Sequence, residues 1–164
     1  MPVSSELVRV LVIGVGATAV MDLWLQLLKR LGIPGLNMAY LGRWVGHLAR
    51  GRMRHTAIAK AVPIPGEAAL GWLAHYLIGV AFAGLLPVVA GRAWLATPSL
   101  LPALLVGIGT VVAPLGLMQP AMGAGLAARK TPTPLKNCLR SLANHSVFGL
   151  GLYLSGQALA TLSR

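Results

Sequence analysis

The side chains with the clearest chemical potential in this sequence are an acid and two bases that stand inside long apolar stretches. Asp22 is the only charged residue between Arg9 and Lys29, and His75 and His145 also interrupt apolar runs. A charged carboxylate in lipid hydrocarbon costs at least about 2.5 kcal/mol, so in a membrane helix Asp22 has to be paired, protonated or bound to a metal. Imidazole groups exchange protons near neutral pH and bind metal ions. These residues therefore direct the search toward proton transfer or metal binding.

The elements that would position these side chains are membrane-spanning helices. The 164 residues are 56% hydrophobic and 10% charged, with a mean hydropathy of +0.74, which is more apolar surface than one small soluble core can bury. A helix rises about 1.5 Å per residue, so about 20 residues cross a bilayer. We therefore predict an all-α integral membrane protein, a four-transmembrane-helix bundle that forms a single domain over residues 1–164. Its helices are expected near residues 7–31, 66–91, 99–127 and 138–162.

The positive charges indicate the orientation of these helices. Most of the 14 lysines and arginines fall in two loops, one between the first and second predicted helices and one between the third and fourth. By the positive-inside rule both loops face the cytoplasm, and both termini lie on the outer side. The net charge of +11 thus indicates topology and contact with anionic lipids rather than nucleic-acid binding. The cations of the two loops are Lys29, Arg30, Arg43, Arg50, Arg52, Arg54, Lys60, Arg129, Lys130, Lys136 and Arg140.

The first loop contains an expected amphipathic segment, residues 37–60, that lies along the membrane surface. After Pro34, a helix breaker, Asn37 can cap a helix whose apolar residues recur at helical spacing, with Arg43 and His47 on the opposite, polar side. The segment is either a lipid-docked connector or a lid over a membrane-facing site. Its apolar side consists of Met38, Leu41, Trp44, Val45 and Leu48. The residues expected to contact lipid headgroups are Trp44, Arg50, Arg52 and Arg54.

Counting along the predicted helices places several polar residues at one depth. Asp22, His75 and His145 all lie roughly 10–14 Å from the cytoplasmic ends of their helices. At that level the third helix, which Pro114 and Pro120 are expected to kink, offers an amide and two thioethers. The simplest interpretation is a hydrogen bond from Asp22 to a histidine or glutamine that only fixes the packing. The predicted layer consists of Asp22, His75, Met118, Gln119, Met122 and His145.

A metal site is one functional interpretation of these residues. Imidazole and carboxylate ligands together suit iron, manganese or zinc, and a transition metal with open positions would allow oxidative or hydrolytic chemistry. Haem held between His75 and His145 is a variant of this hypothesis. No histidine pair of the His-x-x-x-His kind is present, so the spacing identifies neither the metal nor a reaction. The candidate ligands are Asp22, His47, His55, Glu67, His75 and His145.

Two other hypotheses remain open. In a transporter, Asp22 and one histidine would exchange a proton while a small solute crosses, and a homo-oligomer would widen the narrow path that four helices form. In an accessory subunit, glycine-rich faces would dock another membrane protein. Two glycine pairs fit such faces, and two others are expected to allow close contact between neighbouring helices. The docking pairs are Gly123/Gly125 and Gly149/Gly151, and the packing pairs are Gly14/Gly16 and Gly107/Gly109.

Six short strings are spread over the predicted helices and the first loop. They are Ala17-Thr18-x-x-Met21-Asp22-Leu23-Trp24, Gly42-Arg43-Trp44-x-Gly46-His47, Gly51-Arg52-x-Arg54-His55, Pro65-Gly66-Glu67, Gly71-Trp72-x-x-His75-Tyr76 and Met118-Gln119-Pro120-x-Met122-Gly123. Together they resemble a bacterial family of small inner-membrane proteins that is known only as a domain of unknown function. The resemblance covers nearly the whole chain and implies a four-helix protein of the bacterial inner membrane. It implies no activity, substrate or cofactor.

Overall fold

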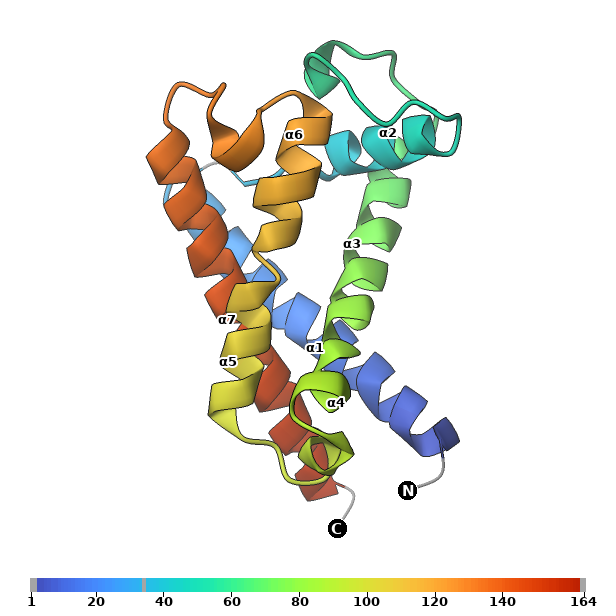
Figure 1. The fold of residues 1–164 in the computed structure, drawn as a ribbon, viewed down its shortest axis with the longest axis vertical. Coiled ribbons are helices and arrows are strands. Elements are labelled where there is room, and N and C mark those ends of the chain that lie inside the picture. Colours follow the sequence, from blue (N-terminus) through green and yellow to red (C-terminus); the bar gives the residue numbers. More distant parts are fainter. Residues whose placement is uncertain (1–2, 34, 163–164) are drawn as a thin grey trace. The chain divides into compact units, whose positions relative to one another are not determined.

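The computed structural model describes residues 3–33 and 35–162, and every regular element in these residues is a helix (Figure 1). The prediction of an all-α protein is thus confirmed. Pro34, the expected helix breaker, lies outside the described residues. The α-helices are α1 (Val3–Arg30), α2 (Met38–Leu48), α3 (Glu67–Ala83), α4 (Leu85–Val89), α5 (Leu100–Gly109), α6 (Gln119–Met122) and α7 (Pro134–Leu162).

Three stretches of the described residues are long and apolar enough to cross a membrane. They are Ser4–Arg30, Glu67–Val89 and Leu100–Met122, and they correspond to the first three predicted spans. The fourth predicted span falls on α7, whose apolar sequence is interrupted by polar residues. α7 begins at Pro134 rather than near residue 138, because a proline in the first turn of a helix has no N–H that needs a partner. The fourth span stays a prediction.

The third span departs from the predicted helix in its middle and at its end. Pro114 has no N–H to donate, and the chain there forms a π-helix, Ala113–Met118, between α5 and α6. Regular helix ends at Met122 rather than near residue 127, because Gly123 takes a left-handed conformation with φ +99°. Gly123 also faces the main chain of Thr56 too closely for any side chain to fit. This glycine both ends the helix and lets the first loop pack against it.

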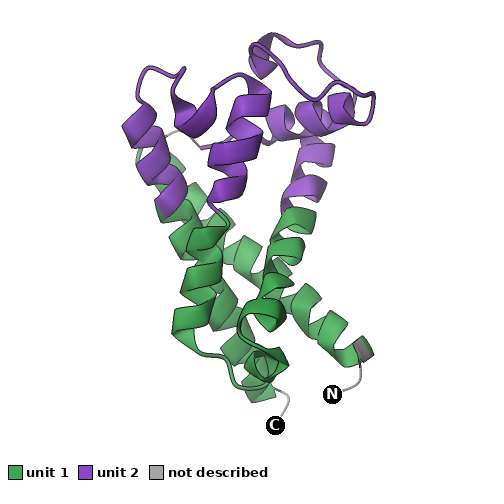
Figure 2. Cartoon of the chain, in the orientation of Figure 1, with its two compact units in different colours: residues 1–33, 76–110, 143–164 green, residues 34–75, 111–142 purple. Residues whose placement is uncertain are grey.

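The described chain forms two compact units, which Figure 2 colours separately. Unit 1 contains residues 3–33, 76–110 and 143–162, and unit 2 contains residues 35–75 and 111–142. α1, α4 and α5 belong to unit 1 and α2 and α6 to unit 2, whereas α3 and α7 contribute to both. Each unit has its own apolar core.

The helices of unit 1 pack through small residues. Gly107 of α5 meets Gly149 of α7, where an added Cβ would lie 2.6 Å from the Gly149 nitrogen. Gly151 of α7 meets Ala17 of α1, and a Cβ there would lie 2.9 Å from the Ala17 Cα. Close approach of this kind is a principal way in which helices associate in lipid. Gly109, by contrast, has nothing within 4 Å of its Cβ position. The predicted packing role is confirmed for Gly14, Gly16 and Gly107.

In unit 2, α2 crosses the beginning of α3 at two glycines. Gly42 faces the carbonyl of Glu67, and Gly71 faces the carbonyl of Met38, each too closely to leave room for a Cβ. The crossing closes an apolar cluster in which Leu41 is only 2% exposed. α2 is therefore fixed against α3 by main-chain contact. The buried members of this cluster are Met38, Leu41, Trp44, Ile58, Ala121 and Met122.

Candidate functional site

Unit 1 pairs the carboxylate of Asp22 with a tyrosine. The Tyr76 hydroxyl, on the part of α3 that belongs to unit 1, donates a hydrogen bond of 2.9 Å to Oδ2 of Asp22. Asp22 lies eight residues before the end of α1 and Tyr76 nine residues after the start of α3, which is about 12–14 Å of helix in each case. The predicted hydrogen bond from Asp22 to a histidine or a glutamine stays a prediction, and Tyr76 is a partner that was not predicted from the sequence. The signal that could have identified Tyr76 is a hydroxyl inside an apolar stretch, directly after His75.

A second polar contact of unit 1 joins α5 to α7. The Thr110 hydroxyl oxygen lies 2.6 Å from the carbonyl of Gly107 and 2.8 Å from Nδ1 of His145. The hydroxyl has one proton and the carbonyl can only accept, so Thr110 donates to Gly107 and accepts from His145. This assignment places the proton of a neutral imidazole on Nδ1 and leaves the lone pair on Nε2. His145 is thus held in one orientation with one basic nitrogen.

A third polar contact of unit 1 links α1 to α7. Nε1 of Trp24 donates to Oδ1 of Asn144 over 3.0 Å. Neither residue was among the predicted site residues, although Asn144 directly precedes His145 and Trp24 lies two residues after Asp22. The three contacts together link α1 to α3, α5 to α7 and α1 to α7, and each includes or adjoins a candidate residue.

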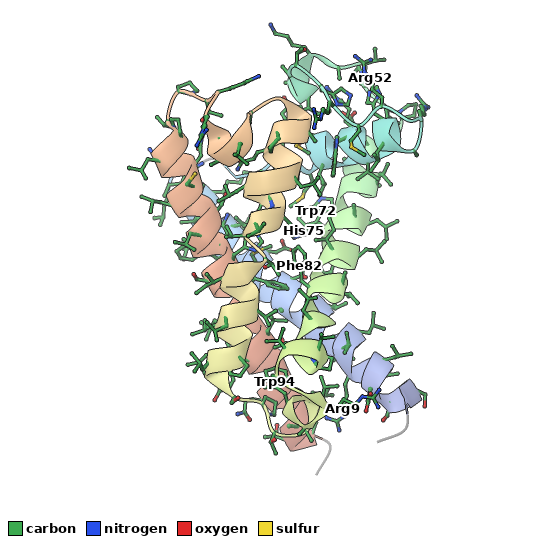
Figure 3. The ribbon with its side chains drawn as sticks, viewed as in Figure 1. Arg9, Arg52, Trp72, His75, Phe82 and Trp94 are labelled. Carbon is green, nitrogen blue, oxygen red and sulfur yellow. The ribbon has the colours of Figure 1, made fainter. Side chains whose placement is uncertain are left out.

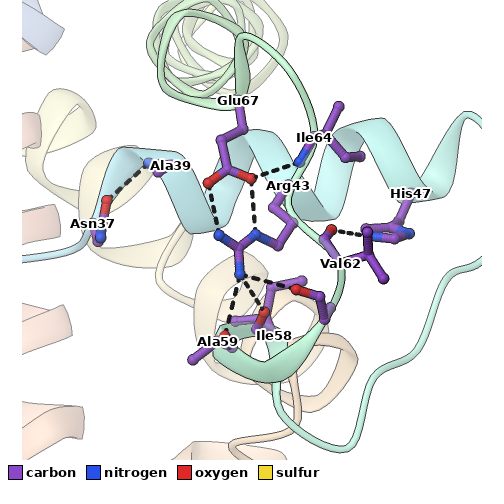
Figure 4. A network of polar contacts seen from close by, with 10 residues as sticks. Asn37, Ala39, Arg43, His47, Ile58, Ala59, Val62, Ile64 and Glu67 are labelled. Atoms are coloured by element: carbon purple, nitrogen blue, oxygen red, sulfur yellow. Dashed lines mark hydrogen bonds and ion pairs between the residues drawn. The ribbon is translucent and has the colours of Figure 1, made fainter.

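The strongest polar feature of unit 2 is an ion pair between a buried arginine, Arg43, and a half-buried glutamate, Glu67 (Figure 4). Arg43 donates from Nη2 to Oε1 of Glu67 at 2.7 Å and from Nε to Oε2 at 2.8 Å. Its Nη1 donates to the carbonyls of Ile58, Ala59 and Ala61 at 3.1–3.2 Å. The hydrogen bond to Glu67 is the main cause that raises the pKa of Arg43, so the guanidinium stays charged. Arg43 is 8% exposed, which corrects the prediction that it lies on an outer polar side of α2.

Unit 2 also contains two histidine rings in contact, those of His47 and His55. His47, 7% exposed, was also predicted on the outer side of α2, but its Nε2 donates to the carbonyl of Val62 over 2.9 Å. The ring of His55 lies edge-to-face with it, with centroids 4.9 Å apart. His55 is 7% exposed, and neither of its ring nitrogens has a hydrogen-bond partner among the described residues. Burial, and then the charges of His47 and Arg52, lower the pKa of His55, so its ring is neutral at pH 7.

The predicted polar layer is divided between the two units. In unit 2, Met122 belongs to the buried apolar cluster and Met118 packs against that cluster. Oε1 of Gln119 is buried and has no hydrogen-bond partner in the part of the chain that the structure describes. His75 lies beside Trp72 on α3, with ring centroids 5.8 Å apart (Figure 3). A single layer across both units stays a prediction. Its members in unit 1 are Asp22 and His145.

The predicted set of metal ligands does not gather into one site. Within residues 3–33 and 35–162, no three side chains of histidine, cysteine, aspartate or glutamate are grouped so that they could hold one ion. Glu67 is engaged by Arg43, and its Oε2 also accepts a hydrogen bond of 3.0 Å from the Ile64 N–H. Of the candidates, the structure brings His47 and His55 together.

The arginines that follow α2 are displayed by an ordered turn. Gly51 has a left-handed conformation, φ +77°, and closes the helix with the two hydrogen bonds of a Schellman motif. Nε1 of Trp44 donates to the carbonyl of Met53 over 3.0 Å and holds the turn. Trp44 is therefore 8% exposed and faces the interior of unit 2 rather than headgroups. Figure 3 shows Arg52 at this turn. The exposed side chains here are Arg50, Arg52, Met53 and Arg54.

A family model matches most of the chain, including parts of both units and every candidate residue. The match extends over residues 11–159, and the family is described as "Protein of unknown function (DUF2938)". No curated protein and no solved structure matches the chain. The match confirms the resemblance to a domain of unknown function. The chain therefore belongs to the DUF2938 family of proteins of unknown function.

Proposed function

We propose that this protein crosses the bacterial inner membrane four times and transports a small solute in exchange for protons carried by Asp22 and His145. Three described stretches have the length and hydropathy of spans. α7 would supply the fourth, because its residues from Ser141 to Leu162 include no charge and extend over about 33 Å. A homo-oligomer would give the solute a wider path.

The distribution of charge supports the proposed orientation. The two basic loops would face the cytoplasm, with both termini on the outer side. Three exposed arginines, Arg50, Arg52 and Arg54, stand on one short turn, and residues 35–66 contain no acidic residue that could pair with them. Arginine forms bidentate hydrogen bonds with phosphate, so this turn is suited to the headgroups of anionic lipids.

The observation that carries the transport proposal is the hydrogen bond from Tyr76 to Asp22. Acidic side chains inside spanning helices are rare, and they mark ion and proton pathways. A tyrosine hydroxyl can donate to a carboxylate and can also accept from a protonated carboxyl, so the contact can persist in both protonation states. Asp22 can therefore exchange a proton without losing its position.

His145 would provide the second proton site. Its Nδ1 is fixed by Thr110, which leaves Nε2 as the nitrogen that can take up and release a proton. Because Nδ1 is the nitrogen that is held, protonation at Nε2 leaves the contact with Thr110 in place.

The accessory-subunit hypothesis is less well supported. The glycines that would form docking faces are in contact with the chain itself: Gly149 faces the main chain of α5, Gly151 faces Ala17, and Gly123 faces Thr56. Residues that pack internally are not available to a partner. The transport hypothesis, in contrast, uses side chains that the structure orients.

Proton entry into proteoliposomes tests the proposal. A potassium diffusion potential would drive protons inward to an internal pH-sensitive dye, with and without a mixture of amino acids, sugars and organic cations trapped inside the vesicles, where the exchange needs them. We expect Asp22→Asn to abolish protein-dependent entry and Tyr76→Phe to reduce it. Glu6→Gln is the matched control on the same helix, because Glu6 lies in the first turns of α1, 3.5 Å from Arg92. Undiminished proton entry with Asp22→Asn, or no protein-dependent entry under any condition, would refute the proposal.

A further inference from the structure

The buried histidine pair of unit 2 has no part in the proposed proton pathway. His55 is more than nine-tenths buried, and both of its ring nitrogens lack a partner among the residues described. Burying a polar group without a hydrogen bond costs free energy, and most buried polar groups in proteins are satisfied. The imidazole of His55 could therefore bind a ligand, and the chemistry of its neighbours indicates the class of that ligand.

The two rings have the separation that a shared metal ion requires. Metal–nitrogen bonds of about 2 Å at a near-tetrahedral angle place two imidazole centres roughly 5 Å apart. The centroids of His47 and His55 are 4.9 Å apart with an interplanar angle of 66°. The separation of the two rings is thus compatible with one ion that both of them bind.

His47 also has the outer hydrogen bond that metal-binding histidines typically make. Its Nε2 donates to the carbonyl of Val62, which fixes the ring and assigns the proton to Nε2. The lone pair of the neutral ring is then on Nδ1. A backbone acceptor of this kind makes the coordinating nitrogen more basic.

The surroundings favour a soft, singly charged ion. No third histidine, cysteine or carboxylate joins the pair in the described part of the chain, whereas structural Zn²⁺ sites use four such ligands. Met122 directly follows Ala121, whose carbonyl accepts a hydrogen bond of 2.8 Å from the His55 N–H, and a thioether is a ligand type that selects Cu⁺. The nearby charge of Arg52 opposes a divalent cation more strongly than a monovalent one.

We propose that His47 and His55 bind one Cu⁺ ion, through Nδ1 of His47 and one ring nitrogen of His55. The ion binds as Cu⁺, so no electron is transferred. Binding would fasten the turn that holds His55 to α2. This site goes beyond the transport proposal and does not depend on it.

Anaerobic Cu⁺ titration of the full-length protein in detergent, against a colorimetric Cu⁺ chelator, tests this site. We expect one Cu⁺ per chain in the wild type and in His75→Ala, the control histidine. His47→Ala and His55→Ala should each weaken binding by more than about 100-fold, because outer-shell changes alone cost 10–100-fold. Absence of saturable binding, binding unchanged in both variants, or preferential binding of Zn²⁺ would overturn the assignment.

X-ray absorption spectroscopy of the Cu⁺-loaded wild type identifies the ligands of the copper ion directly, so this test does not depend on whether the histidine variants fold. We expect scattering from two imidazole rings in the first coordination sphere. A copper environment without imidazole would equally overturn the proposal.

Discussion

Replacement of Gly107 by alanine should force α5 and α7 apart, whereas the same replacement at Gly109 should not. A Cβ at position 107 would lie 2.6 Å from the Gly149 nitrogen and 2.7 Å from the His145 carbonyl oxygen. Both are main-chain atoms that cannot rotate away, and the Gly149 Cα lies closer still, so the helices would have to separate by about 1 Å to restore an ordinary contact of 3.4 Å. Overpacking of this kind costs about 1–3 kcal/mol. A Cβ at position 109 meets nothing within 4 Å.

The two variants form a matched pair, because they make the same chemical change in one helix. Alanine raises helix propensity by about 0.5–1 kcal/mol in the interior of a helix, which applies to Gly107 but not fully to Gly109, the last residue of α5, so a lower stability of Gly107→Ala reports the packing loss against that gain. We expect Gly107→Ala to have an unfolding free energy about 1–3 kcal/mol below that of Gly109→Ala. Reversible unfolding in mixed micelles, followed by circular dichroism, measures this difference. Equal stability of the two variants would refute the reasoning that α5 and α7 meet at Gly107.

Two further predictions concern unit 2, and thermal unfolding of the purified protein in detergent checks both. Glu67→Gln should lower the midpoint temperature of unfolding, because the buried guanidinium of Arg43 loses its charged partner. The control variant Glu6→Gln should change this temperature little. Equal midpoint temperatures in the two variants would contradict a structural role for the ion pair. Gly51→Ala should cost about 1–2 kcal/mol, because Gly51 has φ +77°. Gly35→Ala, at an open position without positive φ, should be near neutral, and a similar loss in both would contradict the turn geometry.

The helical fold and the first three spans could be predicted from composition, because long apolar stretches in lipid have few structures other than a helix. The start of α2 could be predicted too, since Asn37 caps it by accepting a hydrogen bond of 3.0 Å from the Ala39 N–H. The end of the third span could not. It depends on Gly123 packing against Thr56, which is far away in the sequence, and local patterns contain no such information.

The candidate site was predictable to a similar extent. Asp22 stands out because a carboxylate in an apolar stretch is rare, but its partner Tyr76 does not, because a tyrosine fits an apolar helix without special explanation. Arg43 and His47 were placed on an outer side because an amphipathic pattern separates two sides of a helix. It does not show what covers the polar side. Here the chain after α2 folds back and offers carbonyl oxygens to both side chains.

Asp22 is the group on which the proposed function depends, and infrared spectroscopy can follow its protonation directly. The sequence contains three acidic side chains, so few groups contribute to the carboxyl stretch of the reconstituted protein. We predict a protonated-carboxyl band that grows as the pH is lowered, is lost in Asp22→Asn, and is kept in Glu6→Gln and Glu67→Gln. The same band in Asp22→Asn, or its absence from the wild type at every pH at which the protein stays folded, would contradict proton exchange by Asp22.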